Sequence, residues 1–280
     1  MPGRDDKRRK LGEDDKEKML GGDDKGKKAR SGWPKESIPL TYVPHRGILL
    51  YMEESLQLHV VARIRSDFTS KFGIPRQSNL VSSLEAVVVF EPPYRDENAL
   101  RGLEGYSHLW LLWGFSEVHQ QGWSPMVKPP KLGGNQRMGV FATRSPFRPN
   151  PIGLSSVKLV RMEKRPGLGT VLVVSGADLM DGSPIYDIKP YLSFTDSHPD
   201  ARDGFAADHA DERLPVAFPP ELLNRIPEEK RPGLLAALSL DPRPGYLTGR
   251  SDPYGFPYAG KDVRFLVADG VVKVFDVVEP

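Results

Sequence analysis

The chain has 280 residues, a length that is typical of about two domains and allows a buried core. It contains no cysteine, which excludes disulfides, thiol nucleophiles and thiolate metal sites. Its net charge of +2 is only mildly basic, so the charge permits a nucleic-acid partner without indicating one. We find neither an apolar run long enough to span a membrane nor the apolar core of a signal peptide, and we expect a cytoplasmic protein.

Residues 1–36 differ in composition from the rest of the chain. They carry twelve basic and nine acidic residues and almost no β-branched or aromatic ones, so we expect a disordered charged tail. Residues 21–28 nearly match a phosphate-binding loop, but they lack the Ser or Thr after the lysine and the flanking strand and helix. We therefore reject a nucleotide site there. Residues 37–55, which contain Pro39, Tyr42 and Pro44, read as a linker.

The next part of the chain, residues 56–200, is rich in short apolar stretches that we expect to be strands. They cover residues 56–65, 84–90, 107–113, 152–160, 170–175 and 184–191. Leu84–Phe90 is almost continuously apolar, which predicts a strand buried on both faces. Asp96 is expected to cap a short helix over residues 97–103. Because helices do not separate most of these strands, the pattern favours a mainly β barrel or sandwich.

Residues 199–211 are polar and rich in alanine, and we place a domain boundary at residue 200. Beyond it we expect a small α+β domain over residues 201–280. Its elements are a strand at 216–218, helices at 221–225 and 234–240, and a hairpin that pairs residues 263–267 with 271–277. No Gly-x-Gly-x-x-Gly motif follows any strand, so a Rossmann-type cofactor domain is not expected.

Gly139–Leu154 is the most informative stretch of the sequence. Val140, Phe141 and Thr143 predict a strand, after which prolines at 146, 149 and 151 stiffen a loop. This loop presents Arg144 and Arg148, and two fixed guanidinium groups suit a carboxylate or phosphate ligand. The alternative is a proline-stiffened connection with two solvated arginines.

Two other features leave alternatives open. Residues 123–131 form a basic loop with Trp123 and several prolines, which can stack a nucleobase or rest as a lid on its own domain. Asp187 and Lys189 share one face of a predicted strand and can form an ion pair.

The central stretch resembles the signature of the TsaA-like (YaeB/TrmO) family. These enzymes use S-adenosyl-L-methionine to methylate N6 of threonylcarbamoyladenosine in tRNA, at the purine on the 3′ side of the anticodon. Further segments look like the same family, in the same order. They are Ile64-Arg65-Ser66 with Pro75-Arg76-Gln77, Arg101–Glu104 with Ser107–Trp110, Asp181-Gly182 with Asp187–Tyr191, and Asp241-Pro242-Arg243-Pro244.

The resemblance covers about residues 56–280 and implies a fold and partners. The fold is mainly β, a closed β-barrel domain at residues 56–200 with a small α+β C-terminal domain. The partners are a tRNA substrate and a second copy of the chain in a homodimer, with no metal and no membrane. The cofactor is S-adenosyl-L-methionine, held at a site that is not Rossmann-like.

The resemblance also implies which residues hold this cofactor. They are Pro75, Arg76, Gln77, Ser116, Glu117, Arg144, Leu154, Leu179, Met180, Asp181 and Gly182. Arg144 is expected to hold the carboxylate of the methionine part, and Leu154, Leu179 and Met180 are expected to wall the adenine. The family often has a His-Gln pair where this sequence has Ser116 and Glu117.

Methyl transfer is an in-line displacement, so positioning supplies much of the catalysis. The acceptor N6 belongs to a urea and carries a proton, so a proton acceptor would help, and Asp181 and Asp187 are our catalytic candidates. We expect Arg148, Lys189 and Arg243 to contact RNA phosphates or the threonyl carboxylate. Two alternative functions use the same barrel, a non-catalytic RNA- or nucleotide-binding module and a small-molecule methyltransferase.

Overall fold

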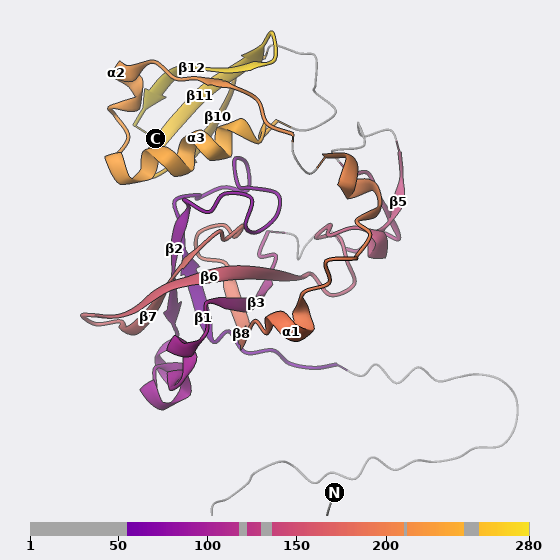
Figure 1. Cartoon of the computed structure of the whole chain (residues 1–280), viewed down its shortest axis with the longest axis vertical. Coiled ribbons are helices and arrows are strands. Elements are labelled where there is room, and N and C mark those ends of the chain that lie inside the picture. Colours follow the sequence, from indigo (N-terminus) through magenta and orange to yellow (C-terminus); the bar gives the residue numbers. More distant parts are fainter. Residues whose placement is uncertain (1–54, 118–121, 130–135, 210–211, 244–251, 280) are drawn as a thin grey trace, which may run out of the picture. The chain divides into compact units, whose positions relative to one another are not determined.

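The structure is a computed structural model that describes residues 55–117, 122–129, 136–209, 212–243 and 252–279 (Figure 1). The predicted disordered tail at residues 1–36 and nearly all of the linker at residues 37–55 lie outside the described residues. The described part is mainly β. It consists of a closed ring of six strands and a small C-terminal sheet.

Six antiparallel strands close on themselves in the order β1-β2-β7-β6-β3-β8. They are β1 (Ala62–Arg65), β2 (Glu85–Phe90), β3 (His108–Gly114), β6 (Ile152–Arg165), β7 (Gly169–Ser175) and β8 (Pro184–Pro190). The ring closes where β8 pairs with β1 through Ala62 opposite Ile185. The predicted strands are thus found in one sheet, although β1 begins at Ala62 and is shorter than the predicted strand from residue 56.

Alternate side chains of the strands fill the ring. In β3, Leu109, Leu111 and Trp113 point inward and are buried, whereas His108, Trp110 and Leu112 are half-buried. The same alternation holds in β2, where Val87 and Val89 are only half-buried, so the prediction of a strand buried on both faces was wrong for this strand. That description fits β7 instead, in which every residue from Val171 to Ser175 is buried.

Short 3-10 turns connect β2 with β3. They are η1 (Pro92–Tyr94), η2 (Glu97–Leu100) and η3 (Leu103–Gly105). The carboxylate of Asp96 accepts a hydrogen bond from the backbone N–H of Asn98, so the predicted cap is confirmed. The helix that follows it is shorter than expected, because the backbone is extended at Arg101 and left-handed at Gly102, with φ of 88°.

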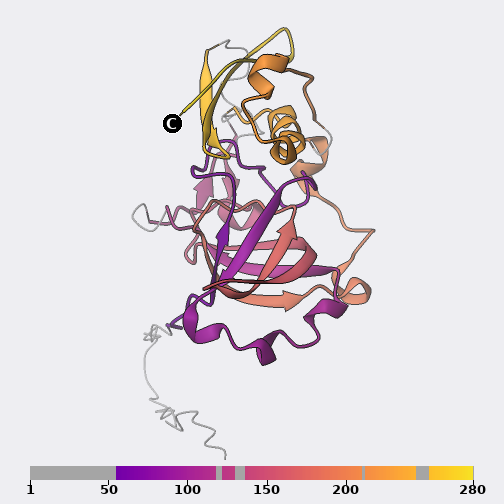
Figure 2. The same ribbon diagram turned by 90° about the vertical axis from the view of Figure 1, so that its left-hand side faces the viewer.

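The C-terminal part is a mixed sheet backed by helices (Figure 2). Its strand order is β10-β11-β12-β9, with β9 parallel to β12. The strands are β9 (Val216–Ala217), β10 (Tyr254–Tyr258), β11 (Lys261–Ala268) and β12 (Val271–Val278), and the helices are α2 (Pro220–Leu223), η7 (Glu228–Lys230) and α3 (Arg231–Ser239). The predicted hairpin is confirmed, and Asp269 and Gly270 take the positive φ angles of its turn.

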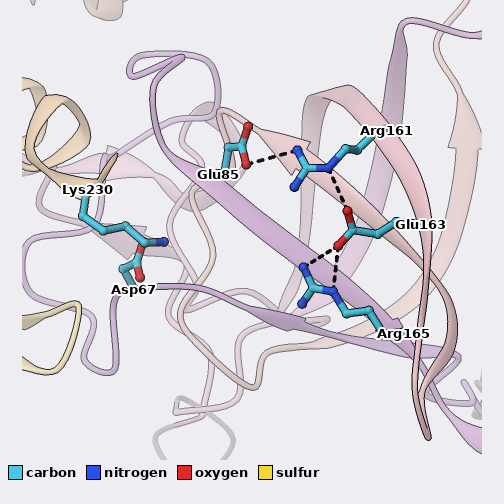
Figure 3. A network of polar contacts seen from close by, with 6 residues as sticks. All are labelled: Asp67, Glu85, Arg161, Glu163, Arg165 and Lys230. Carbon is cyan, nitrogen blue, oxygen red and sulfur yellow. Dashed lines mark hydrogen bonds and ion pairs between the residues drawn. The ribbon is translucent and has the colours of Figure 1, made fainter. Parts of the chain in front are cut away.

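The segment between β1 and β2 contributes to the C-terminal core. Phe68, Val81 and Leu84 pack in one apolar cluster with residues of α3 and of β10 to β12. Lys230 and Asp67 form an ion pair of 2.7 Å between the same two parts (Figure 3). The predicted domain boundary at residue 200 stays a prediction. Residues before this boundary, in the β1–β2 segment, contribute to the core of the C-terminal sheet.

An ion-pair network also lies across the strands of the ring (Figure 3). Arg161 bonds Glu163 at 2.8 Å and Glu85 at 3.5 Å, and Arg165 bonds Glu163 at 2.6 Å. These side chains are 30 to 48 % exposed, so water screens the pairs and they add little to the stability of the fold.

The remaining short elements are β4 (Met126–Val127), β5 (Met138–Gly139), η5 (Val140–Ala142), α1 (Ser193–Asp196) and η6 (Gly204–His209). Among the described residues, no helix is both long and apolar enough to cross a membrane.

Candidate active site

The central stretch does not begin as the predicted strand. β5 ends at Gly139, and Val140–Ala142 form the 3-10 turn η5. Thr143 closes this turn, since both its N–H and its hydroxyl donate to the carbonyl of Val140, at 3.1 and 2.9 Å. The intrinsic β preference of these residues is overridden by this local hydrogen bonding.

Arg148 braces the loop from within. Its guanidinium donates to the carbonyls of Thr143 at 2.7 Å and Ser145 at 3.3 Å, and it lies 5.9 Å from the ring centroid of Phe141. These contacts hold Arg148 in its own loop, so an RNA contact would have to compete with them.

Arg144 is exposed and reaches a distant segment instead. Its Nη1 donates to Oε1 of Gln77 at 2.5 Å, which brings together two of the predicted cofactor residues. Gln77 is a neutral amide. Within the described part of the chain, no carboxylate lies within ion-pair distance of Arg144, and its positive charge is therefore available to an anionic ligand.

The segment that carries Gln77 is fixed by Asn79. The side-chain amide of Asn79 donates to the hydroxyl of Ser156 at 2.8 Å, and its backbone N–H donates to the carbonyl of Gly176 at 2.8 Å. Asn79 has a φ of 64°, a left-handed conformation that asparagine tolerates better than most residues. A Cβ at Gly176 would lie 2.6 Å from Oδ1 of Asn79, so only glycine allows this close contact.

Asp178 lies between these segments, just after β7. Its Oδ1 accepts a 2.6 Å hydrogen bond from the hydroxyl of Ser155, which in turn accepts one of 3.0 Å from the indole N–H of Trp113. Burial raises the pKa of the Asp178 carboxyl, while the hydroxyl of Ser155 and the nearby charge of Arg144 act in the opposite direction. Our sequence reasoning missed Asp178, although an aspartate directly after a long apolar strand is a detectable signal.

The three apolar residues predicted to contact the adenine differ in exposure. Leu179 is 1 % exposed and belongs to the core of the ring, so its side chain does not present a surface to a ligand. Leu154 is 55 % exposed and points outward from β6, whereas the adjacent Ser155 points inward. Met180 is half-buried. The structure thus brings Arg144 and Gln77 together and places Leu154 on the opposite face of β6 from Ser155.

Asp181 and Gly182 form the predicted turn, and both bond to residues in or next to β1. Oδ1 of Asp181 accepts from the backbone N–H of Ser66 at 3.0 Å, and its Oδ2 lies 3.5 Å from Arg65. Gly182 has a φ of 77° and bonds the backbone of Ile64. These contacts engage both carboxylate oxygens of Asp181, just as the N–H of Ile188 and the ammonium of Lys189 engage those of Asp187.

Asp187 and Lys189 form the expected ion pair, with Nζ and Oδ2 2.8 Å apart, and this contact raises the pKa of Lys189. Both side chains are exposed on the outside of the ring. Strict alternation predicts Tyr186 and Ile188 on the same face of β8. This prediction fails because a bulge opposite Leu112 and Trp113 inserts an extra residue.

Ser116 and Glu117 lie at the end of β3, and both are exposed. The carboxylate of Glu117 lies 3.6 Å from Nζ of Lys71. The chain does contain a His-Gln pair, at residues 119–120, which lie outside the described residues.

Arg243 is buried, with 6 % of its surface exposed. Its guanidinium forms two hydrogen bonds of 2.8 Å with the carboxylate of Asp241, which raises its pKa. The RNA contact of Arg243 stays a prediction, and it would have to compete with this pairing to Asp241.

Arg76 does not form an open wall either. Its Nη2 donates to the carbonyl of Arg243 at 2.7 Å, and burial lowers its pKa. Arg76, Pro75 and Asp241 line a small cavity of about 110 Å³ between the β1–β2 segment and α3. Nη1 of Arg76 is buried and has no hydrogen-bond partner in the described residues. Among all the residues that the structure describes, no group of three or more potential metal ligands is found.

Comparisons with known proteins give a consistent result. Residues 63–197 match the model of the tRNA-methyltransferase O N-terminal domain. The chain is 41 % identical over 231 residues to the tRNA (adenine(37)-N6)-methyltransferase of Escherichia coli K12, covering 79 % of this chain and 97 % of that protein. It is 43 % identical over 177 residues to the enzyme of the same name from Eikenella corrodens, covering 60 % and 95 %.

A solved structure shows the same similarity in three dimensions. The crystal structure of TrmO from Pseudomonas aeruginosa superimposes with a TM-score of 0.66 and 32 % sequence identity. The superposition covers 82 % of this chain and all of that one.

Proposed function

This chain belongs to the tRNA-methyltransferase O family, and we infer that it is an S-adenosyl-L-methionine-dependent tRNA (adenine37-N6)-methyltransferase that acts on threonylcarbamoyladenosine. One observation carries this conclusion, the 41 % identity that extends over 97 % of the Escherichia coli enzyme. The six-stranded ring is then the family's β-barrel, and the natural location of the enzyme is the cytoplasm, where its tRNA substrate is found.

The residues gathered at the end of the ring fit this cofactor. Arg144 offers an exposed guanidinium whose partner in the described structure, Gln77, is neutral. We assign it to the carboxylate of the cofactor's methionine part, because a carboxylate and a guanidinium match in charge and in geometry. When bound, the cofactor supplies an activated methyl group on a sulfonium.

Asp187 is the better placed of the two candidates for accepting the N6 proton. The strand registers place Leu154 opposite Leu112, and Leu112 opposite Asp187, so the three form one row across the outer face of the ring. With strands about 4.8 Å apart, this row spans about 10 Å, within the dimensions of a nucleoside. Asp187 would take the proton, and Lys189 would face RNA phosphate.

We propose that the homodimer expected for this family uses the outer face of β6. Ile152 and Leu154 are 38 % and 55 % exposed there, and exposed apolar side chains in one row are typical of an interface. Light scattering of the wild type and of Leu154→Asp tests this proposal. A monomeric wild-type protein would contradict it.

A methyl-transfer assay tests the function directly. The protein is incubated with tritiated S-adenosyl-L-methionine and tRNA that contains or lacks threonylcarbamoyladenosine. We expect label only in the tRNA that contains the modified base. Binding of tRNA without transfer would indicate a non-catalytic module, and transfer to a metabolite without tRNA affinity would indicate a small-molecule methyltransferase.

A further inference from the structure

Asp178 lies where the segments assigned to the cofactor converge. Ser155, which donates to its carboxylate, is adjacent to Leu154 on β6, and the segment of Gln77 is held near it by the bond from the N–H of Asn79 to the carbonyl of Gly176. Leu179 is its neighbour in the chain, and Arg144 is close enough to act on it by charge. No other side chain described here connects so many of these segments.

The hydrogen bonds at Asp178 run from Trp113 through Ser155 to the carboxylate. An indole N–H can only donate, so Ser155 accepts from Trp113 and must use its own hydrogen toward Asp178. Oδ1 of Asp178 accepts this hydrogen bond, which opposes the rise in the pKa of Asp178 that burial causes. Replacing this carboxylate by a neutral group of the same shape leaves the Ser155 bond possible, which allows its charge to be tested separately.

The charge of this carboxylate lacks a close counter-ion. Among the described residues, no lysine, arginine or histidine forms an ion pair with Asp178, and Arg144 acts on it only through space. Asp178 is only partly buried, so part of the residue remains accessible. A largely buried carboxylate and an exposed guanidinium, neither of which forms an ion pair in this part of the chain, thus interact by charge.

We propose that Asp178 binds the α-ammonium group of the cofactor's methionine part, while Arg144 binds its carboxylate. An α-amino acid is a zwitterion whose two charges are fixed next to each other, and a paired carboxylate and guanidinium complement both. Holding both charges fixes the orientation of the methionine part, and with it the direction in which the sulfonium presents its methyl group. This assignment rests on the proposed function and adds a residue to its binding site.

The experiment uses S-adenosylhomocysteine and its deamino analogue, which lacks only the α-ammonium group, and measures their affinities by calorimetry. The wild type is expected to bind S-adenosylhomocysteine at least ten-fold more tightly, which corresponds to about 1.4 kcal/mol. Asp178→Asn is expected to lose this preference, with the affinity for the deamino analogue unchanged within about two-fold. Asp262→Asn is the matched control, because Asp262 lies in the C-terminal sheet and pairs with Arg264 at 3.0 Å.

Each outcome decides the proposal. If the wild type binds both compounds equally, or if Asp178→Asn weakens both to the same extent, Asp178 does not bind the ammonium group. If Asp178→Asn fails to fold, equal binding of the two compounds by the wild type still overturns the proposal. Failure of the wild type to bind S-adenosylhomocysteine at all would instead count against the proposed function itself.

Discussion

Gly153→Ala is predicted to destabilise the ring, because β6 has no room for a side chain there. A Cβ at Gly153 would lie 2.3 Å from Cε2 and 2.7 Å from Nε1 of Trp113, well inside van der Waals contact. The indole cannot easily retreat, since it is 7 % exposed, packs 4.4 Å from the ring of Phe115 and donates to Ser155. Overpacking of this kind costs about 2 kcal/mol, which lowers the melting temperature of a chain of this size by about 4–8 °C.

Gly114→Ala provides a comparison on the neighbouring strand. The atom nearest to a Cβ at Gly114 is the hydroxyl oxygen of Tyr186, at 2.3 Å, at the end of a side chain that can swing away. Thermal and urea unfolding of both variants should show the larger loss for Gly153→Ala, by at least about 1 kcal/mol. Equal stabilities of the two variants, or a Gly153→Ala protein as stable as the wild type, would refute the reasoning.

Three further predictions follow from charged groups. Asp187→Asn should lower kcat at least ten-fold without changing cofactor affinity, and an unchanged kcat would remove Asp187 as the proton acceptor. A double-mutant cycle of Asp67→Asn and Lys230→Met should give a coupling of about 1 kcal/mol by urea unfolding, and a zero coupling would contradict a role for this ion pair. Because burial raises the pKa of Asp178 in the folded state, its contribution to stability is greatest below its usual pKa and declines as pH rises through the raised value. Asp178→Asn should therefore gain stability relative to the wild type between acidic and neutral pH. A difference in the free energy of unfolding that stays constant with pH would contradict the raised pKa of Asp178.

The elements that the sequence predicted well are those with a local chemical cause. Asp269 and Gly270 define the C-terminal hairpin, and Asp96 defines the helix start after β2. By contrast, Tyr254–Tyr258 contains both a glycine and a proline, which resemble turn signals, so we missed β10. Its strand character comes from pairing with β11, a contact that local preference cannot reveal.

Closure of the ring also cannot be predicted from local sequence patterns. Ala62 pairs with Ile185, and nothing in either strand specifies the other. The resemblance to a family predicted a closed barrel, whereas the strand pattern alone left barrel and sandwich open.

The site residues divide in a similar way. The sequence indicated Arg144 as a guanidinium held by a stiff loop for a carboxylate ligand, and the structure adds its contact with Gln77. It did not indicate that Arg148 and Arg243 satisfy carbonyl and carboxylate groups of their own segments, because burial and pairing depend on the folded chain. Asp178 was missed for the same reason, since its partners Ser155 and Trp113 come from two other strands.

The central claim is that Arg144 holds the carboxylate of the methionine part of S-adenosyl-L-methionine, and calorimetric titration of the cofactor tests it most directly. Arg161→Ala is the matched control, because Arg161 is also exposed on the ring but pairs with Glu85 and Glu163. We predict that Arg144→Ala weakens binding by about 10- to 100-fold, the loss expected for a charged hydrogen bond, while Arg161→Ala binds like the wild type. Equal affinities of the two variants would contradict the account.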